Sequence, residues 1–385
     1  MLKILFTTSL LLCSLSVAAL ALNVEELRLS KAQTDIPNIA SRYDGLVSIF
    51  KQKIKTATNE QQITQATATI GNRLWQQAVR DVQAGHFDDR PLYWSRLALR
   101  KLAKDDNDTK LQLANWQRQI LTRSIETTSR GINDLHFSPK TDIKILLTGF
   151  DPFFLDKNIA QSNPSGLAAL ALDGFKFKVG KKTAQIQTVM IPVRFVDFDQ
   201  GMIEGILTPM FRARSIDAVF TVSMGRTDFD LEHFPAKNRS AVAPDNLNIY
   251  TKASKQSPKA PRLRGKTLNG AEFIEFTLPV KAMQSINGKW KVNDNKQVST
   301  LQQGKFKAKT LADLKNQTSV TGSGGGYLSN EISYRSIRLM KQFNLTIPNG
   351  HIHTPKIKGY DAATEAEIVA QIQAMVVAAM KALEF

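Results

Sequence analysis

The hydrophobic spacing of the chain changes once, near residues 131–142, and this change constrains the fold more than any other feature. Before it, apolar residues recur every three to four positions over 63–84, 92–102 and 111–125. That spacing is typical of helices that bury one face. After it, the apolar residues gather into short runs bounded by glycine and polar residues, as expected for buried strands. The chain therefore predicts a helical unit followed by a sheet-containing unit.

Strand-like and helix-like segments alternate in the second unit. Strands are predicted at 144–148, 186–191 and 216–222, and helices at 164–172 and 198–210. Alternation of this kind is typical of a parallel sheet covered by helices on both faces. We therefore expect an α/β fold, a three-layer α/β/α sandwich around a largely parallel, twisted sheet.

The length of 385 residues exceeds what one hydrophobic core usually supports. We place a small helical region at 22–140 and an α/β domain at 141–385. Two polar stretches, 248–266 and 287–309, are expected to be surface insertions in that domain. An amphipathic helix over 362–383 is expected to close the chain.

Three tryptophans of the helical region, Trp75, Trp94 and Trp116, lie within the predicted helices or at their edges. Large aromatic side chains on amphipathic helices usually pack into a core. We expect all three in the core of this region rather than around a ligand.

The first 21 residues have the order of a secretory signal. A single charge at Lys3 precedes an apolar run, which ends at Ala19-Leu20-Ala21. The run is short of the roughly 20 residues that a spanning helix needs. We expect cleavage after Ala21, export to the periplasm or the cell exterior, and no stable membrane anchor.

The only cysteine, Cys13, lies inside the expected signal. Its removal would leave the mature protein without a thiol. This excludes a disulfide, a thiolate metal site and a cysteine nucleophile in the mature chain.

The formal net charge is +17, and the expected loss of Lys3 leaves +16. The basic residues are dispersed, without the interleaved aromatics of a groove that binds single strands. Export also argues against a nucleic-acid partner, so we interpret the charge as a solvated basic surface.

Polar residues that could carry chemistry occur in three motifs. The sequence TGFDPF at 148–153 is followed by Asn163-Pro164-Ser165. The segment GRTDFDLEH places Glu232 in a predicted loop after an apolar strand. The segments GSGGGYLSNEISY and GHIHTP contain Ser329 and His353.

The glycine run before Ser329 predicts a turn that leads into a helix. A helix amino terminus offers free N–H groups and positive potential, which favour a nucleophile and an oxyanion. His353 is the candidate base, and Glu232 would orient its imidazole. The alternatives are a capping serine, a structural histidine and a surface carboxylate. His351 and His353 could suggest a metal pair, but no third ligand stands at a recognisable spacing, so neither metal nor cofactor is expected.

The ordered combination of these motifs, from 144 to 385, resembles the pyroglutamyl peptidase I family, also called pyrrolidone-carboxylate peptidase. The resemblance also includes Pro244-Asp245-Asn246 and Leu278-Pro279-Val280-Lys281. It implies an α/β/α fold, a Cys-His-Glu triad and removal of an amino-terminal pyroglutamate through a thioester. Glu232 and His353 match the family's residues, whereas Ser329 stands at the position of the cysteine.

The resemblance also implies a substrate pocket. Phe150 and Phe153 match the aromatics that help cover the pyroglutamate ring. Tyr327 and Leu328 match the apolar pair that precedes the nucleophile.

Four departures from the family pattern fall in or near that pocket. Phe154 and Leu155 replace two glycines, and Ser223-Met224-Gly225 shortens a motif with glutamine and glycines. Val242 stands where the family tends to carry an arginine, although Arg239 lies nearby. The changes enlarge side chains or remove hydrogen bonds, so the resemblance transfers the fold better than the substrate.

The sequence leaves two functions open. The first is an exported hydrolase that acts on peptide amino termini through a Ser-His-Glu triad. The second is a catalytically inactive member of the family that binds peptides or envelope components. A purely structural role would instead predict an apolar pocket without convergent polar groups. Some members of the family self-associate, and the extra helical region leaves the oligomeric state open.

Overall fold

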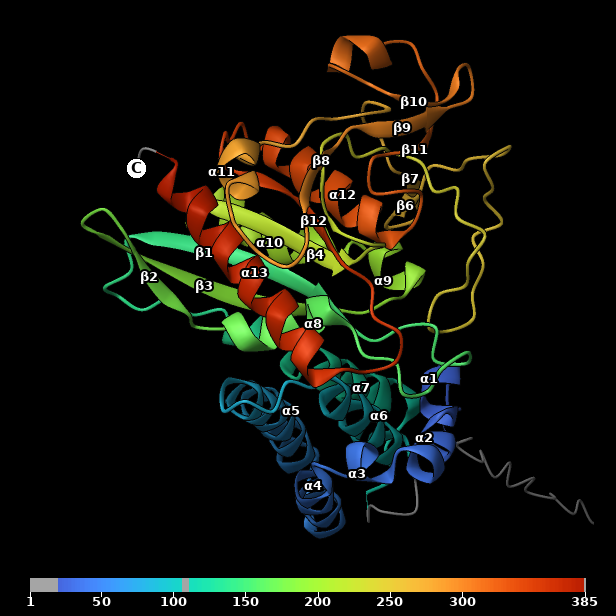
Figure 1. Cartoon of the computed structure of the whole chain (residues 1–385). Coiled ribbons are helices and arrows are strands. Elements are labelled where there is room, and N and C mark those ends of the chain that lie inside the picture. Colours follow the sequence, from blue (N-terminus) through green and yellow to red (C-terminus); the bar gives the residue numbers. More distant parts are fainter. Residues whose placement is uncertain (1–19, 106–110, 384–385) are drawn as a thin grey trace, which may run out of the picture.

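The structure is a computed structural model that describes residues 20–105 and 111–383 (Figure 1). Most of the expected signal, Lys3 and Cys13 included, lies outside these residues, and its cleavage and export stay predictions. Within the described ranges, no helix is both long enough and apolar enough to cross a membrane.

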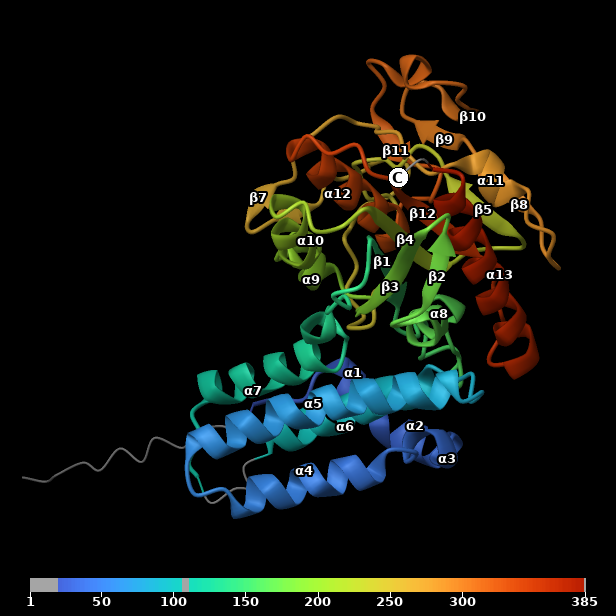
Figure 2. The same cartoon turned by 90° about the vertical axis from the view of Figure 1, so that its left-hand side faces the viewer.

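The amino-terminal region is helical, as predicted. Its helices are α1 (Val24–Leu27), α2 (Leu29–Asp35), α3 (Pro37–Ala40), α4 (Asp44–Thr56), α5 (Glu60–Gln83), α6 (Arg90–Lys104) and α7 (Asn115–Thr128). The Asn59 side chain caps α5 by accepting from the Gln62 amide, and a proline stands in the first turn of α6. Figure 2 shows α4 to α7 as a group of helices beneath the sheet-containing part.

The tryptophans of this region behave differently from one another. Trp75 and Trp94 are fully buried, as predicted. The expectation for Trp116 is wrong, because its side chain is 60% exposed. Trp116 lies near the start of α7, on the side of that helix away from the buried Leu121 and Ile125.

The centre of the second unit is a seven-stranded sheet of order β2-β3-β1-β4-β12-β5-β8. Its strands are β1 (Ile143–Phe150), β2 (Lys176–Val179), β3 (Lys182–Ile191), β4 (Ala218–Met224), β5 (Phe229–Glu232), β8 (Val292–Asn295) and β12 (Asn349–Thr354). Strands β3, β1, β4 and β12 run parallel, whereas β2 and β5 are antiparallel to a neighbour. The predicted, largely parallel sheet is therefore confirmed.

Helices cover both faces of this sheet, which confirms the predicted α/β class. They are α8 (Pro164–Leu172), α9 (Phe195–Asp199), α10 (Met202–Arg212), α11 (Val280–Gln284), α12 (Leu328–Gln342) and α13 (Ala362–Lys381). Helices α10 and α12 pack together on one face, and α8 and α13 pack together on the other. The stretch predicted as one helix over 198–210 is divided between α9 and α10.

The two polar stretches differ in structure. The first, 248–266, is mostly irregular and includes β6 (Arg262–Leu263), which pairs with β7 (Lys266–Thr267). The second, 287–309, contributes β8 to the main sheet. It also forms β9 (Gln297–Thr300) and β10 (Gly304–Lys307), which make a small sheet with β11 (Ser319–Thr321).

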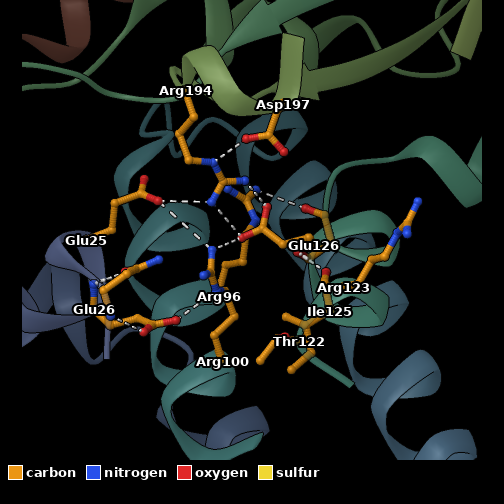
Figure 3. A network of polar contacts seen from close by, with 12 residues as sticks. Glu25, Glu26, Arg96, Arg100, Thr122, Arg123, Ile125, Glu126, Arg194 and Asp197 are labelled. Carbon is orange, nitrogen blue, oxygen red and sulfur yellow. Dashed lines mark hydrogen bonds and ion pairs between the residues drawn. The ribbon is translucent and has the colours of Figure 1, made fainter. Parts of the chain in front are cut away.

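The helical region packs against the α/β part through an apolar cluster and an ion-pair network. Leu155 and Ile159, from the loop after β1, share the apolar cluster with Leu29 and Trp94. The network, drawn in Figure 3, joins carboxylates of α1 and α7 to Arg100 of α6 and to Arg194, which precedes α9. The two regions therefore share a packed interface.

Candidate active site

The motif residues meet where the carboxyl ends of the parallel strands β1, β4 and β12 lie side by side. The first turn of α12 faces the same edge, because α12 packs on β4 and β12. In open α/β sheets, ligands usually bind at this edge of the strands.

A glycine-rich turn, 322–326, positions the start of α12. A Cβ atom on Gly322 would lie 2.1 Å from Asn330 Oδ1, and one on Gly326 would lie 2.0 Å from Ser240 Oγ. Asn330 fixes the turn further, since its side chain donates to Ala236 O at 2.7 Å and accepts from Ala236 N at 2.9 Å. A side chain at Gly322 would clash with Asn330 of α12, and one at Gly326 would clash with Ser240, so either would displace the turn.

Ser329 lies in the first turn of α12, as predicted. Its hydroxyl donates to Gly324 O at 3.2 Å. Among the residues that the structure describes, no hydrogen bond joins Ser329 to His353. The serine is therefore placed at the helix start, with its proton directed to the glycine-rich turn.

His353 and Glu232 are brought together. Nδ1 of His353 is hydrogen-bonded to Glu232 Oε1. The other carboxylate oxygen accepts from Asn295 Nδ2 at 2.9 Å, and Asn295 also donates to Ser323 O at 3.0 Å. Asn295 thus ties the carboxylate to the glycine-rich turn, and this residue lies in the stretch expected to be a surface insertion.

The predicted loop position of Glu232 is wrong, because Glu232 is the last residue of β5 and is 2% exposed. Its strand pairs with both β12 and β8. Burial raises the pKa of Glu232 above its ordinary value, and the facing His353 opposes that rise. The carboxylate is therefore enclosed, and it is hydrogen-bonded to the imidazole of His353 and to the amide of Asn295.

The four predicted pocket residues line one pocket together with Ser329. The lining consists of Phe150, Phe153, Asn163, Val193, Ser223, Met224, Tyr327, Leu328 and Ser329. The aromatic rings come from the end of β1 and the start of α12. Whether these side chains contact a substrate stays a prediction.

A second histidine, His351, was considered at the sequence level only as part of a metal pair. It is fully buried, and its ring lies between two hydroxyls, with Thr221 Oγ1 2.8 Å from Nδ1 and Ser223 Oγ 2.8 Å from Nε2. Burial lowers the pKa of His351 well below its ordinary value, and the neighbouring His353 adds to this effect. The signal in the sequence is the alternation within each strand, which puts Thr221 and Ser223 on one face of β4 and His351 and His353 on one face of β12. The register between the two strands then sets His351 opposite Thr221 and His353 opposite Ser223.

The structure shows where the departures from the family pattern lie, and it gives a packing reason for one of them, Leu155. Phe154 has a φ of 59°, in the left-handed region that glycine favours. Leu155 is buried against the helical region. Arg239 is paired with Glu331, whereas Val242 is 75% exposed and has no contact that explains it.

Within the described ranges, no group of three or more histidine, cysteine, aspartate or glutamate side chains could hold a metal ion.

Comparisons with known proteins identify relatives of both regions. The family described as PA0049, C-terminal domain, matches residues 144–311 and 283–358, and the family described as PA0049 N-terminal domain matches 10–126. A Pseudomonas aeruginosa protein, described as Uncharacterized protein PA0049, is 26% identical over 416 residues. The match spans 83% of this chain and 75% of that protein.

Solved structures of pyrrolidone carboxyl peptidase from Pyrococcus furiosus are also similar. One is a crystal structure of that enzyme and its cysteine-free mutant, with 20% identity, a TM-score of 0.43, and coverage of 63% of this chain and 100% of that chain. A single-site mutant of the same enzyme has 21% identity and a TM-score of 0.41, with coverage of 62% and 99%.

Proposed function

The chain belongs to the PA0049 family, and we propose that it is an exported, pyroglutamyl-peptidase-like hydrolase that acts on blocked peptide amino termini. The observation that carries the proposal is the hydrogen bond between buried Glu232 and Nδ1 of His353. A carboxylate that accepts the Nδ1 proton leaves Nε2 as a base, which is the arrangement of serine and cysteine hydrolases. Ser329 is the candidate nucleophile at the neighbouring helix start.

The proposed reaction begins when the Ser329 hydroxyl turns from Gly324 O toward His353. Its oxygen attacks the carbonyl carbon of the amide after the blocked residue, and the proton passes to His353 Nε2. The N–H groups in the first turn of α12 would stabilise the oxyanion. The intermediate then collapses to an ester on Ser329, and the leaving amine takes the proton from His353.

Water completes the cycle. His353 takes a proton from a water molecule, whose oxygen attacks the ester carbonyl. The C–O bond to Ser329 breaks, and the serine oxygen recovers its proton from His353. Glu232 keeps the imidazole oriented and stabilises its charged form in both halves of the reaction.

The experiment is hydrolysis of a pyroglutamyl fluorogenic amide by the mature protein, with Ser329→Ala and Ser329→Cys in parallel. Ser333→Ala, in the same helix, serves as the matched control. We expect activity in wild type and in the control, and none in Ser329→Ala. Unchanged turnover in Ser329→Ala would contradict the assignment.

A catalytically inactive binding module is the second candidate. It is favoured by the hydrogen bond from the Ser329 hydroxyl to Gly324 O rather than to an imidazole. This candidate predicts that wild type binds a pyroglutamyl peptide without cleaving it, and that only Ser329→Cys shows turnover. Calorimetric titration beside the activity assay separates the two functions.

A further inference from the structure

The hydroxyl of Thr221 fixes the direction of a short chain of hydrogen bonds. Its oxygen lies 3.1 Å from Gly350 O and 2.8 Å from Nδ1 of His351. A carbonyl oxygen can only accept, so the single hydroxyl proton points to Gly350. The same oxygen must then accept from His351, which places the imidazole proton on Nδ1.

The second ring nitrogen of His351 is therefore an acceptor. It lies 2.8 Å from Ser223 Oγ, and a neutral imidazole with its proton on Nδ1 can only accept there. The ring is completely enclosed, which disfavours the charged form that would donate from both nitrogens. The Ser223 proton thus points to His351, and the oxygen of Ser223 keeps lone pairs for the pocket that it lines.

The other hydroxyls of the pocket are oriented in the same sense. Tyr327 donates to Pro244 O at 2.7 Å, and Ser329 donates to Gly324 O at 3.2 Å. Each of these protons is directed to a backbone carbonyl. The side-chain hydroxyls of the pocket consequently offer hydrogen-bond acceptors rather than donors.

The rest of the described lining is uncharged and mostly apolar. Asn163 is 1% exposed, with its amide turned to Asp151 O and Ser165. A carboxylate placed against the hydroxyls of Ser223 and Tyr327 would meet acceptors without a compensating donor, and an ammonium would lose water without a countercharge. The pocket therefore suits a neutral, compact group that supplies its own N–H donor.

We propose that Thr221, His351 and Ser223 form a polarity relay, and that the relay selects ligands presenting an uncharged N–H group to Ser223. The inference rests on the proposed function and adds the specificity-determining pair, Ser223 and His351. Ser223 recognises the donor, and His351 acts through it as a positioning residue. Without His351 the serine hydroxyl rotates and can donate as well as accept.

A matched pair of ligands tests the relay. The first is the amide of pyroglutamate, and the second is its lactone analogue, in which oxygen replaces the ring N–H. Binding is measured by calorimetry with the Ser329→Ala protein, so that hydrolysis does not interfere. We expect the lactam to bind at least about tenfold more tightly, because the lactone leaves two acceptors facing each other.

Two further substitutions in the Ser329→Ala background locate the effect. Ser223→Ala should reduce the lactam preference to about twofold or less. His351→Phe should reduce it too, through tighter lactone binding, because the freed Ser223 hydroxyl can now donate. A preference that survives both substitutions would overturn the proposal.

The protonation of His351 is tested without any ligand. Nitrogen-15 NMR of the imidazole should show the proton on Nδ1, and a proton on Nε2 would overturn the relay. Equal binding of lactam and lactone would also overturn it while leaving the proposed function standing. Binding of neither ligand would contradict the proposed function itself.

Discussion

Two polar clusters flank the pocket, and they differ in how their hydrogen-bonding groups are used. At the interface with the helical region, arginines and carboxylates alternate, and buried Asp151 is paired with both Arg96 and Arg130 (Figure 3 shows Arg96). At the strand ends, Glu232 faces imidazole and amide groups, and His351 lies between hydroxyls. In the first cluster the charged groups are paired with opposite charges. In the second, some acceptor atoms are left free to face the pocket.

The pKa values of one carboxylate from each cluster, Glu126 and Glu232, differ in the same way. Burial alone would raise the pKa of Glu126 in the interface cluster, but three neighbouring arginines lower it well below its ordinary value. Burial raises the pKa of Glu232, and the opposing effects of His353 and Arg226 do not reverse the rise. Removal of one partner from a cluster that is charged on both sides should destabilise the fold, whereas a cluster that leaves a base available suits catalysis.

The largest effect should follow from removal of the proposed base. His353→Asn is expected to reduce kcat by about 10⁴-fold or more, because Ser329 then lacks a proton acceptor. His233→Asn is the matched control, since His233 bonds Asp294 and Glu275 outside the pocket. Steady-state kinetics of both variants would contradict the account if they lost activity equally.

Glu232→Gln should lower kcat by about 10²- to 10⁴-fold, because an amide no longer holds His353 with its proton on Nδ1. The side chain keeps its size, so the free energy of unfolding should change less than the activity does. Kinetics and chemical denaturation of the same preparation measure the two effects. A large loss of stability with unchanged kcat would show that Glu232 stabilises the fold and does not take part in catalysis.

The interface cluster should respond in the opposite way. Asp151→Asn leaves Arg96 without its buried countercharge and Arg130 with Glu126 alone, and we expect a loss of about 3–5 kcal/mol in the free energy of unfolding. Asp197→Asn removes a partly exposed partner of Arg194 and should cost below about 1 kcal/mol. Urea denaturation of both variants measures these losses of unfolding free energy. Equal small losses would show that burial does not determine how much an ion pair of this network contributes to stability.

A smaller effect, dependent on pH, is expected where α13 meets the helical region. Burial raises the pKa of Glu365 from 4.5 to about 8, and Ser162 is hydrogen-bonded to its carboxyl group. Because the folded state prefers the protonated form, this stability is present below pH 4.5 and is lost as pH rises through 8. Between pH 6 and pH 9, wild type should lose on the order of 2 kcal/mol more than Glu365→Gln. Thermal unfolding across this range measures the difference, and parallel curves would contradict it.

Much of the fold could be predicted from periodicity. The run at 144–148 became β1, and the alternation after it gave a mostly parallel sheet with helices on both faces. The exposure of Trp116 could not be predicted in this way. Which face of a helix becomes buried depends on residues that are distant in the sequence. The hydrogen bond from Asn295 to Glu232 could not be predicted for the same reason, since the two residues meet only because β8 pairs with β5.

The candidate site was predicted unevenly. The motifs singled out Glu232, His353 and Ser329, which the structure brings to one edge of the sheet, and their catalytic roles stay predictions. The hydrogen bonds of His351 could not be predicted from the sequence, because they depend on the register between β4 and β12. That register is not set by any local pattern of residues. Alternation within each strand gave the shared face, but not the pairing of Thr221 with His351.

The most direct test of the central claim is to identify the residue that becomes covalently attached. Wild type would be incubated with a pyroglutamyl phosphonate ester directed at serine nucleophiles, with Ser329→Ala as the control, and the attachment site mapped by mass spectrometry. The account predicts one adduct, on Ser329, that is missing from the control. An adduct on Ser223, or turnover of substrate without any adduct on Ser329, would contradict it.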